Sequence, residues 1–466
     1  MLRVGLLIAL VLGVAYGMQG AIAVAQEDLK PSATTAVARA ALPRGTVRDF
    51  GPAPQALTTP LSAATREALD AVFGTLDGGP WGDTQDRALD TIVATKDARL
   101  AWLLADLMRF ATSPTLQAEF AGRASALLDV ELSGFDTWHL LTERLIAWDV
   151  PAPPDYLKYK RALFVQVLPE WEPLFQPGSI DWRHVSWGGV PIDDRGFDQT
   201  DEPCNCIPAA DNPEVTSAAD AHWLADDAVV FGIELNGESR AYPRRIMEVR
   251  EMVNDTLGGR DLGIPYCTLC GAAQAWLTDE VPSGVERPVL RTSGLLIRSN
   301  KVMFDLNTKS VFDTFRGNAV TGPLAERGLQ LNGVAVVTTT WGEWKRAHPK
   351  TTVLTEALAL GRDFDFRNNR DANGPIFPIG DADPRLAVQE EVLGVVTDTG
   401  DALAFHVPSV IAALDAGRRV QVDNVQVVLD AGGVRALGRD GELLGTHQAF
   451  WFAWSQFYPG TRLWPE

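Results

Sequence analysis

The chain has 466 residues, of which 46% are hydrophobic and 22% are charged, and its formal net charge at pH 7 is −19. This composition is typical of a folded globular protein, and the length predicts two or three domains rather than one hydrophobic core. The negative charge argues against nucleic acid and anionic membrane surfaces as partners, because like charges repel at long range.

The first 25 residues have the pattern of a signal peptide. Arg3 supplies the positive charge, an apolar run follows from Val4 to Gly17, and Ala23-Val24-Ala25 forms a small-residue cleavage site. This pattern predicts an exported protein, periplasmic or extracellular. An uncleaved membrane anchor is the alternative, since the apolar run nearly reaches the roughly 20 residues that span a bilayer. We expect no membrane contact beyond this segment.

A helical domain is predicted for residues 61–170, after an Ala-, Pro- and Thr-rich linker over residues 26–60. Leu69, Val72 and Phe73 have the spacing of one helix face, and Asp97 and Ser113 are placed as N-caps of later helices. Short amphipathic helices with tight turns resemble helical repeats of the HEAT type. We therefore expect a protein partner, if there is one, to bind through this domain.

Residues 171–215 are dense in Pro, Gly and Trp, which predicts an irregular connector between domains. From residue 216 onward the apolar period shortens to two. The clearest hairpin runs over residues 231–242, with its turn at Asn236-Gly237. The sequence therefore predicts an α+β fold, in which an all-helical N-terminal domain precedes a β-rich domain with short helices at residues 216–466.

Two segments of the β-rich region match each other. The segments that begin at Trp341 and Trp451 both read Trp-x-x-Trp-x-x-x-x-Pro-x-Thr. Tryptophans three residues apart share one helix face, so we interpret each pair as core rather than as a ligand cage. The match predicts that the domain is built from two degenerate repeats, a first unit at residues 216–355 and a second at residues 385–466.

The four cysteines form one Cys-x-Cys and one Cys-x-x-Cys-Gly motif; they are Cys204, Cys206, Cys267 and Cys270. A disulfide within Cys-x-Cys closes a small strained ring, so we expect each pair to find its partners in the other pair. Either two disulfides join the pairs, which is the default for an exported protein, or four thiolates bind one zinc, copper or iron ion. A self-contained dithiol at Cys267 and Cys270 is the remaining possibility.

Five motifs, taken in order, give the chain a resemblance to the domain-of-unknown-function family 3179. They are Ala241-Tyr242-Pro243, Glu251-x-Val253-Asn254-Asp255-Thr256-x-Gly258-Gly259, Tyr266-Cys267-x-Leu269-Cys270-Gly271, Ser293-Gly294-Leu295-Leu296 and Trp341-x-x-Trp344. The resemblance implies a polar set around the cysteines, namely Arg250, Glu251, Asn254, Arg291, Ser293 and Asp305. This set is either a ligand pocket or a buried network of salt bridges and caps.

The chain departs from the family pattern at Arg250, where a histidine is common, and at Thr268, where a proline is common. Arginine cannot ligate a metal, so a mixed Cys/His site is not expected here. The sequence thus predicts an exported protein whose four-cysteine site binds metal or undergoes thiol/disulfide chemistry. The alternative is a non-catalytic interaction module stabilised by disulfides.

Overall fold

The computed structural model describes residues 42–74, 81–134, 136–197, 199, 204–355 and 374–465. The predicted signal peptide and the first part of the predicted linker lie outside these residues. Among the helices of the described ranges, none combines the length and the apolarity needed to cross a membrane.

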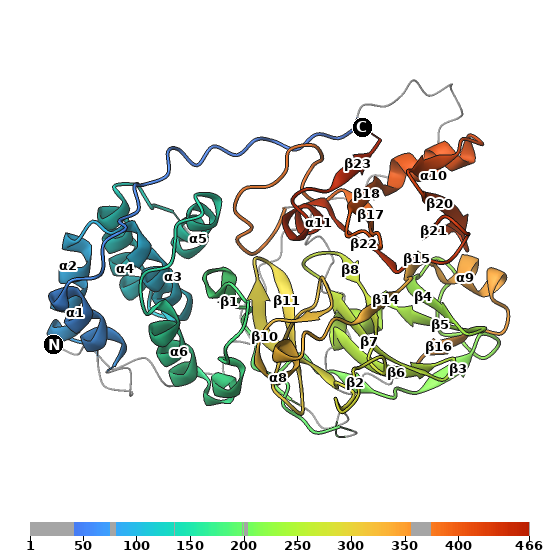
Figure 1. The fold of residues 1–466 in the computed structure, drawn as a ribbon, viewed down its shortest axis with the longest axis horizontal. Coiled ribbons are helices and arrows are strands. Elements are labelled where there is room, and N and C mark those ends of the chain that lie inside the picture. The colour runs from blue at the N-terminus through green and yellow to red at the C-terminus, as the bar shows by residue number, and fades with distance from the viewer. Residues whose placement is uncertain are drawn as a thin grey trace.

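The N-terminal part of the described chain is helical (Figure 1). Its α-helices are α1 (Ala63–Phe73), α2 (Asp83–Ala94), α3 (Ala101–Phe110), α4 (Pro114–Leu128), α5 (Thr137–Ala147) and α6 (Tyr156–Val167). Two of the starts show the predicted capping chemistry: Ser113 accepts a hydrogen bond from the Leu116 amide at the start of α4, and Asp97 caps the 3₁₀ turn Ala98–Leu100 that leads into α3. The two predicted caps are therefore confirmed.

The C-terminal part contains five sheets. In hydrogen-bonded order, the first sheet is β1 (Val185–Trp187), β10 (Leu290–Ile297), β11 (Asn300–Asp305), β12 (Val311–Asp313) and β13 (Asn318–Ala319). The second is β14 (Asn332–Val334), β9 (Ala275–Leu277), β7 (Arg260–Cys267), β6 (Met252–Leu257) and β2 (Ala210–Asp211), with β8 (Ala272–Ala273) paired to β7. The third is β15 (Val337–Thr340), β4 (Val229–Leu235), β5 (Glu238–Pro243), β16 (Thr352–Leu354) and β3 (Val215–Ser217).

The fourth sheet is β22 (Thr446–Phe450), β17 (Glu391–Val396), β18 (Ala402–His406) and β23 (Arg462–Trp464), and the fifth is β19 (Val420–Val422), β20 (Val425–Asp430) and β21 (Gly433–Leu437). Short helices connect the strands; they are α7 (Arg244–Arg250), α8 (Gly322–Glu326), α9 (Trp341–Ala347), α10 (Val407–Asp415) and α11 (Trp451–Phe457).

The five sheets follow one another in a ring. β10 contacts β6, β5 contacts β6, β15 contacts β21, and β21 contacts β17. The ring closes where Phe315, after β12, stacks on Phe457 at the end of α11, with ring centroids 4.7 Å apart. This arrangement is like the five blades of a β-propeller. The prediction of two degenerate repeats is therefore wrong, although the α+β class broadly describes the chain.

The matched tryptophan segments explain why the sequence suggested two units. They form α9 and α11, and the second indole of each packs on a strand glycine: an added Cβ would lie 2.3 Å from the Trp344 ring at Gly232 and 2.0 Å from the Trp454 ring at Gly394. This local packing recurs in the third and fourth sheets. The other three sheets have no part in the match, so it does not define a repeat of the whole domain.

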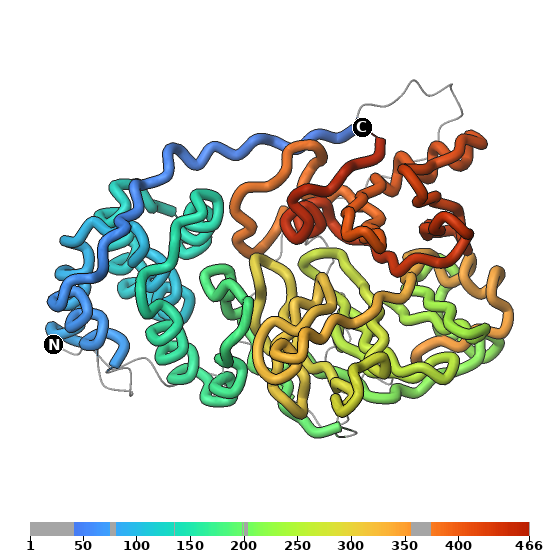
Figure 2. Tube along the Cα trace, viewed as in Figure 1, coloured from blue at the N-terminus to red at the C-terminus, as the bar shows by residue number. Residues whose placement is uncertain are grey.

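The helices and the first sheet share one hydrophobic core. Phe110 of α3 stacks on Trp187 of β1, and the buried Trp171 indole donates to the Ser293 carbonyl of β10 at 2.8 Å. Figure 2 shows the helical segment, blue to teal, against the start of the β region, with the red C-terminal segment resting on the yellow and green strands. The predicted connector thus contributes β1 to the first sheet.

Candidate functional site

The Cys-x-x-Cys motif forms a tight turn between β7 and β8. Cys267 ends β7, and its carbonyl accepts a hydrogen bond from the Cys270 amide at 3.2 Å. Gly271 follows with φ +60°, and a Cβ there would lie 3.0 Å from the Phe450 ring. The glycine is required both by this left-handed conformation and by the close approach of β22. The turn places both thiols on the same side of the chain.

Both thiols are buried, neither is in a disulfide, and they share one acceptor. Cys267 Sγ and Cys270 Sγ lie 3.7 and 3.4 Å from the Ser299 carbonyl oxygen, and Cys270 Sγ lies 3.6 Å from Asn300 Oδ1. Ser299 sits in the β10–β11 turn with φ +110°, which a residue other than glycine rarely adopts. This conformation directs its carbonyl toward the two sulfurs.

Burial and hydrogen bonds act on the pKa of the Cys267 thiol in opposite directions. Burial raises the pKa of this thiol, but hydrogen bonds with the Cys270 side chain and with the backbone of Lys301, Cys270 and Leu269 act in the opposite direction, so the pKa falls below its ordinary value. A thiolate is the form that binds metals and attacks disulfides. The direction of this shift helps metal binding and thiol chemistry alike, so the pKa alone does not choose between them.

A buried ion pair lies beside the turn. Lys301 Nζ pairs with the Glu251 carboxylate and also donates to the Tyr266 carbonyl at 3.1 Å. Thr268, inside the Cys-x-x-Cys motif, donates to Glu251 Oε1 at 3.1 Å. Glu251 has φ +50° at the end of α7, so the backbone itself turns this carboxylate toward the motif. The pair joins the cysteine turn to β11 and α7.

The rest of the predicted polar set binds protein groups elsewhere in the domain. Arg291 forms a fully buried ion pair with Asp211 at 2.5 Å, and Asn254 donates to the same carboxylate at 2.8 Å. Arg250 donates to the Ala209 carbonyl at 3.4 Å. These contacts tie β2 to β6 and β10.

Two further members of the set fix irregular positions of the first sheet, a β-bulge and a turn. Ser293 Oγ donates to the Val302 carbonyl at 2.5 Å, across a β-bulge in the β10–β11 pairing. The Asp305 carboxylate accepts from the amides of Val289 and Thr308 at 2.9 and 2.8 Å. Glu251 is thus the member of the set that contacts the cysteine turn through Thr268, and a ligand pocket formed by the set stays a prediction.

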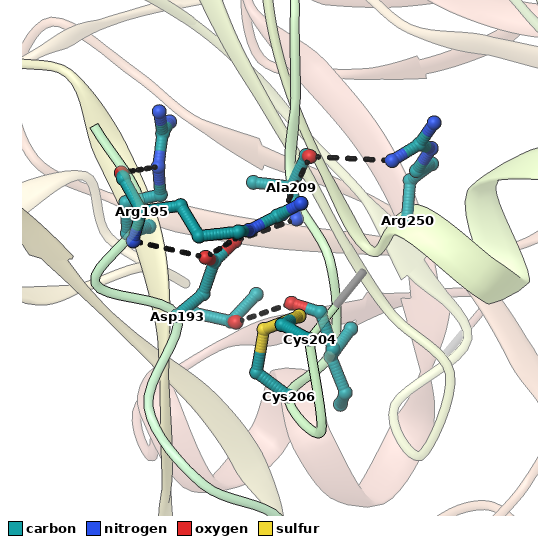
Figure 3. Close-up of a disulfide and its surroundings, with 9 residues drawn as sticks. Asp193, Arg195, Cys204, Cys206, Ala209 and Arg250 are labelled. Atoms are coloured by element: carbon teal, nitrogen blue, oxygen red, sulfur yellow. Dashed lines mark hydrogen bonds and ion pairs between the residues drawn. A yellow bond between two sulfur atoms is a disulfide. The ribbon is translucent and has the colours of Figure 1, made fainter. Parts of the chain in front are cut away.

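The two cysteine pairs do not meet. Cys204 and Cys206 form a disulfide with each other, and the carboxylate of Asp193 lies within 4.8 Å of their sulfurs (Figure 3). Within the described ranges, no cluster of three or more metal-binding side chains includes Cys267 or Cys270. The expectation that each pair finds its partners in the other is therefore not met.

The pairs do not meet because they lie near opposite ends of β10. Thr292, near the start of β10, donates to the Ile207 carbonyl at 2.7 Å, whereas the carbonyl that faces Cys267 belongs to Ser299, beyond its end. Asp193 also accepts from the Ala209 amide at 2.8 Å and so anchors the loop after Cys206 (Figure 3). The length of a strand separates the pairs.

Sequence reasoning missed Ser299, Asn300 and Lys301, which complete the surroundings of the turn. Their signal was a polar tetrapeptide, residues 298–301, which spans the turn after β10 and the first two residues of β11. It has the pattern of an ordinary hairpin turn. Only the packing of the second sheet on the first brings this turn to Cys267.

Fold and site together define a class of protein: a helical domain joined to a propeller-like ring of five sheets with a buried dithiol turn. The chain belongs to the family described as "Protein of unknown function (DUF3179)", whose profile matches residues 204–445, slightly more than half of the chain. No curated protein matches the chain. No solved structure matches it either.

Proposed function

We propose that the Cys267–Cys270 turn binds one monovalent copper ion through two thiolates, in a protein exported from the cytoplasm. The observation that carries this proposal is the juxtaposition of two buried thiols, outside any disulfide, in a Cys-x-x-Cys-Gly turn, with the pKa of Cys267 lowered by hydrogen bonds despite its burial. Thiolates are soft ligands and select soft metal ions.

The ligand count favours copper over zinc and iron. Structural zinc sites take four protein ligands in a tetrahedron, and thiolate-bound iron–sulfur clusters also need four cysteines. In the part of the chain that the structure describes, no third Cys, His, Asp or Glu joins the two sulfurs in a cluster of ligand dimensions. Monovalent copper is satisfied by two thiolates, so the turn suits this ion without a further side chain.

Burial argues against disulfide exchange with a protein partner as the main activity. Exchange needs direct attack by one sulfur on another, and the residues of Cys267 and Cys270 are 3% and 0% exposed. The first Cys also ends a strand rather than starting a helix, so it lacks the helix N-terminus that activates thioredoxin-like thiols. Formation of an intramolecular disulfide by a small oxidant is tested separately, by exposing the copper-free and the copper-loaded chain to air and counting their thiols.

The test is copper binding by the reduced chain under anaerobic conditions. Monovalent copper is titrated against bicinchoninate as a competing chelator, and reduced thiols are counted in the same samples. We expect one copper ion per chain in the wild type and loss of this binding in Cys267→Ser and in Cys270→Ser. The matched control is Cys204→Ser/Cys206→Ser, which removes the other pair and retains copper binding.

Three results would overturn the proposal. Stoichiometric thiols with no copper bound would leave an inert dithiol. Loss of copper binding only in the Cys204→Ser/Cys206→Ser variant would move the site to the cluster with Asp193. Rapid air oxidation of Cys267 and Cys270 to a disulfide that copper does not prevent would favour thiol/disulfide chemistry instead.

A further inference from the structure

A cavity of about 240 Å³ lies where the predicted connector, the first sheet and α11 meet. Its lining comes from residues 179–184, from the β10–β11 turn at Arg298, from residues 313–320 and from the end of α11. Phe457 lines it and also stacks on Phe315 in the contact that closes the ring of sheets. Ligand sites usually have volumes of about 300 to 1,000 Å³, so this cavity suits a small molecule or one group of a larger one.

Arg298 brings a cation without an anionic partner to this cavity. Its guanidinium makes one hydrogen bond in the described chain, from Nη2 to His184 Nε2 at 3.5 Å, and it forms no ion pair with a carboxylate of the described residues. Its Nε and Nη1 atoms have no protein partner there, yet they are not among the buried polar atoms without one, so they keep accessible surface. The chain thus places unused, accessible guanidinium donors at the cavity.

The backbone holds Arg298 in place before any ligand binds. Arg298 has φ +53° in the β10–β11 turn, and its amide donates to the His184 carbonyl at 2.9 Å. The turn is therefore pinned to the connector. A group that is already fixed loses less freedom on binding, which favours affinity.

Arg316 is the second cation of the lining. Its side chain is 46% exposed, one of its nitrogens donates to the Phe457 carbonyl, and another lies 3.8 Å from the Asp313 carboxylate. Burial lowers the pKa of Arg298, and the positive charge of Arg316 acts in the same direction, so the two guanidinium groups repel each other. An anion bound at Arg298 would reduce this repulsion.

The carboxylates of the lining do not neutralise Arg298. Asp181 is already bound by Arg183, whose Nε and Nη2 lie 3.0 and 2.6 Å from its two oxygens. Asp313 has Arg316 as its cationic neighbour at 3.8 Å. One positive charge is thus left without a counter-charge in the described chain, and a ligand that supplies this counter-charge must be an anion.

We propose that this cavity binds a small oxyanion, a carboxylate or a phosphate group, through the guanidinium groups of Arg298 and Arg316. The planar guanidinium fork matches two oxygens of such a group, and hydrogen bonds to ionised acceptors are stronger than those between neutral groups. The cavity shares no side chain with the cysteine turn, so the inference is independent of the copper proposal.

The experiment titrates the full chain with inorganic phosphate, sulfate, acetate and succinate by calorimetry at constant ionic strength. We expect one anion per chain, and the order of the four affinities shows whether the site prefers tetrahedral anions or carboxylates. Arg298→Gln should weaken binding about tenfold, because it removes charge-assisted hydrogen bonds. The matched control is Arg435→Gln, which removes the same charge from a half-buried arginine of β21, outside the cavity, and should leave the affinity unchanged.

Stability separates a ligand contact from a structural role. Arg298 forms no ion pair in the described chain, so Arg298→Gln should leave the melting temperature of the anion-free chain unchanged or raise it. A saturating concentration of the tightest anion should raise the melting temperature of the wild type but not that of Arg298→Gln, because only the folded wild type offers the site.

Asp313 provides a second test, in which binding is gained rather than lost. Asp313→Asn removes a negative charge from the lining but retains an oxygen that can accept from the Phe315 amide, as Asp313 does at 3.1 Å. The variant should bind the anion severalfold more tightly. Burial raises the pKa of Asp313 to about 6, so the wild type should bind sulfate, whose own charge is constant, more tightly at pH 5.5 than at pH 7.5. Asp313→Asn should lose most of this dependence.

The other titratable groups near the cavity, among the described residues, keep one charge state over this pH range. Burial lowers the pKa of His184 to about 4 and raises that of Tyr458, which lies near Asp313. Burial also opposes ionisation of Asp181, but hydrogen bonds from Arg183 outweigh it and lower the pKa of this carboxyl. Arginine side chains do not titrate in proteins. The change in affinity between the two pH values therefore reports on Asp313.

Three results would overturn the proposal: no binding of any of the four anions at millimolar concentration, full affinity in Arg298→Gln, or equal losses of affinity in Arg298→Gln and Arg435→Gln, which would show an effect of net charge alone. Weaker anion binding in Asp313→Asn than in the wild type would also contradict it, since removal of a like charge from the site must favour the anion.

Discussion

His447 makes the stability of the β domain sensitive to acid. This residue lies on β22, is 8% exposed, and has its pKa lowered from 6.5 to about 4 by burial. Between these two pH values the unfolded chain binds a proton that the folded chain does not. The free energy of unfolding therefore falls as the pH drops through this window, and the contribution is fully present above pH 6.5.

The magnitude follows from the size of the shift. One pKa unit corresponds to about 1.4 kcal/mol, so a shift from 6.5 to about 4 is worth on the order of 3 kcal/mol below both values and about 2.5 kcal/mol at pH 4.5. The perturbation is His447→Phe, which keeps an aromatic ring beside Phe315, whose ring centroid lies 5.2 Å from that of His447.

The assay is urea denaturation of the wild type and of His447→Phe at pH 7.5 and pH 4.5. Burial also lowers the pKa of His184 to about 4, but this residue is present in both proteins and cancels in the comparison. We expect the wild type to lose about 2.5 kcal/mol more than the variant on acidification. Equal losses of unfolding free energy in the two proteins would refute the reasoning, because the His447 imidazole would then have the same pKa in the folded and the unfolded chain.

Two further predictions concern packing and charge. Gly394→Ala places a methyl group 2.0 Å from the Trp454 ring. This overpacking should lower the free energy of unfolding by roughly 1 to 3 kcal/mol. An unchanged melting temperature would contradict this prediction, because it would show that α11 shifts without cost to make room for the methyl group. Lys301→Met removes the cation that pairs with the buried Glu251 carboxylate and should lower the free energy of unfolding by about 3 to 5 kcal/mol. The double variant Lys301→Met/Glu251→Gln should recover part of that stability, because no unpaired charge is left buried. A double variant as unstable as the single one would contradict the ion-pair account.

Local chemistry could be predicted from the sequence. Residues 231–242 form the predicted hairpin, β4 and β5, Ser113 caps α4, and Asp97 caps the 3₁₀ turn that leads into α3. The chain also falls in the family that its ordered motifs indicated. Each of these features depends on residues close together in the chain, where turn geometry and capping dominate.

The ring of five sheets could not be predicted in the same way, because its sheets recruit strands from distant segments. β1 comes from the predicted connector and pairs with β10, and β16 joins β5 in parallel. Neither pairing leaves a periodic signal in the sequence. The same limit applies to the site: Ser299 reaches Cys267 only through packing between two sheets.

The copper site is tested most directly by X-ray absorption spectroscopy at the copper edge of the full chain loaded anaerobically with one equivalent of monovalent copper. Two sulfur atoms in the first coordination shell, and their loss in Cys270→Ser with retention in Cys204→Ser/Cys206→Ser, are the predicted result. A shell of nitrogen or oxygen atoms alone, or a spectrum that Cys270→Ser leaves unchanged, would contradict the assignment of the Cys267–Cys270 turn.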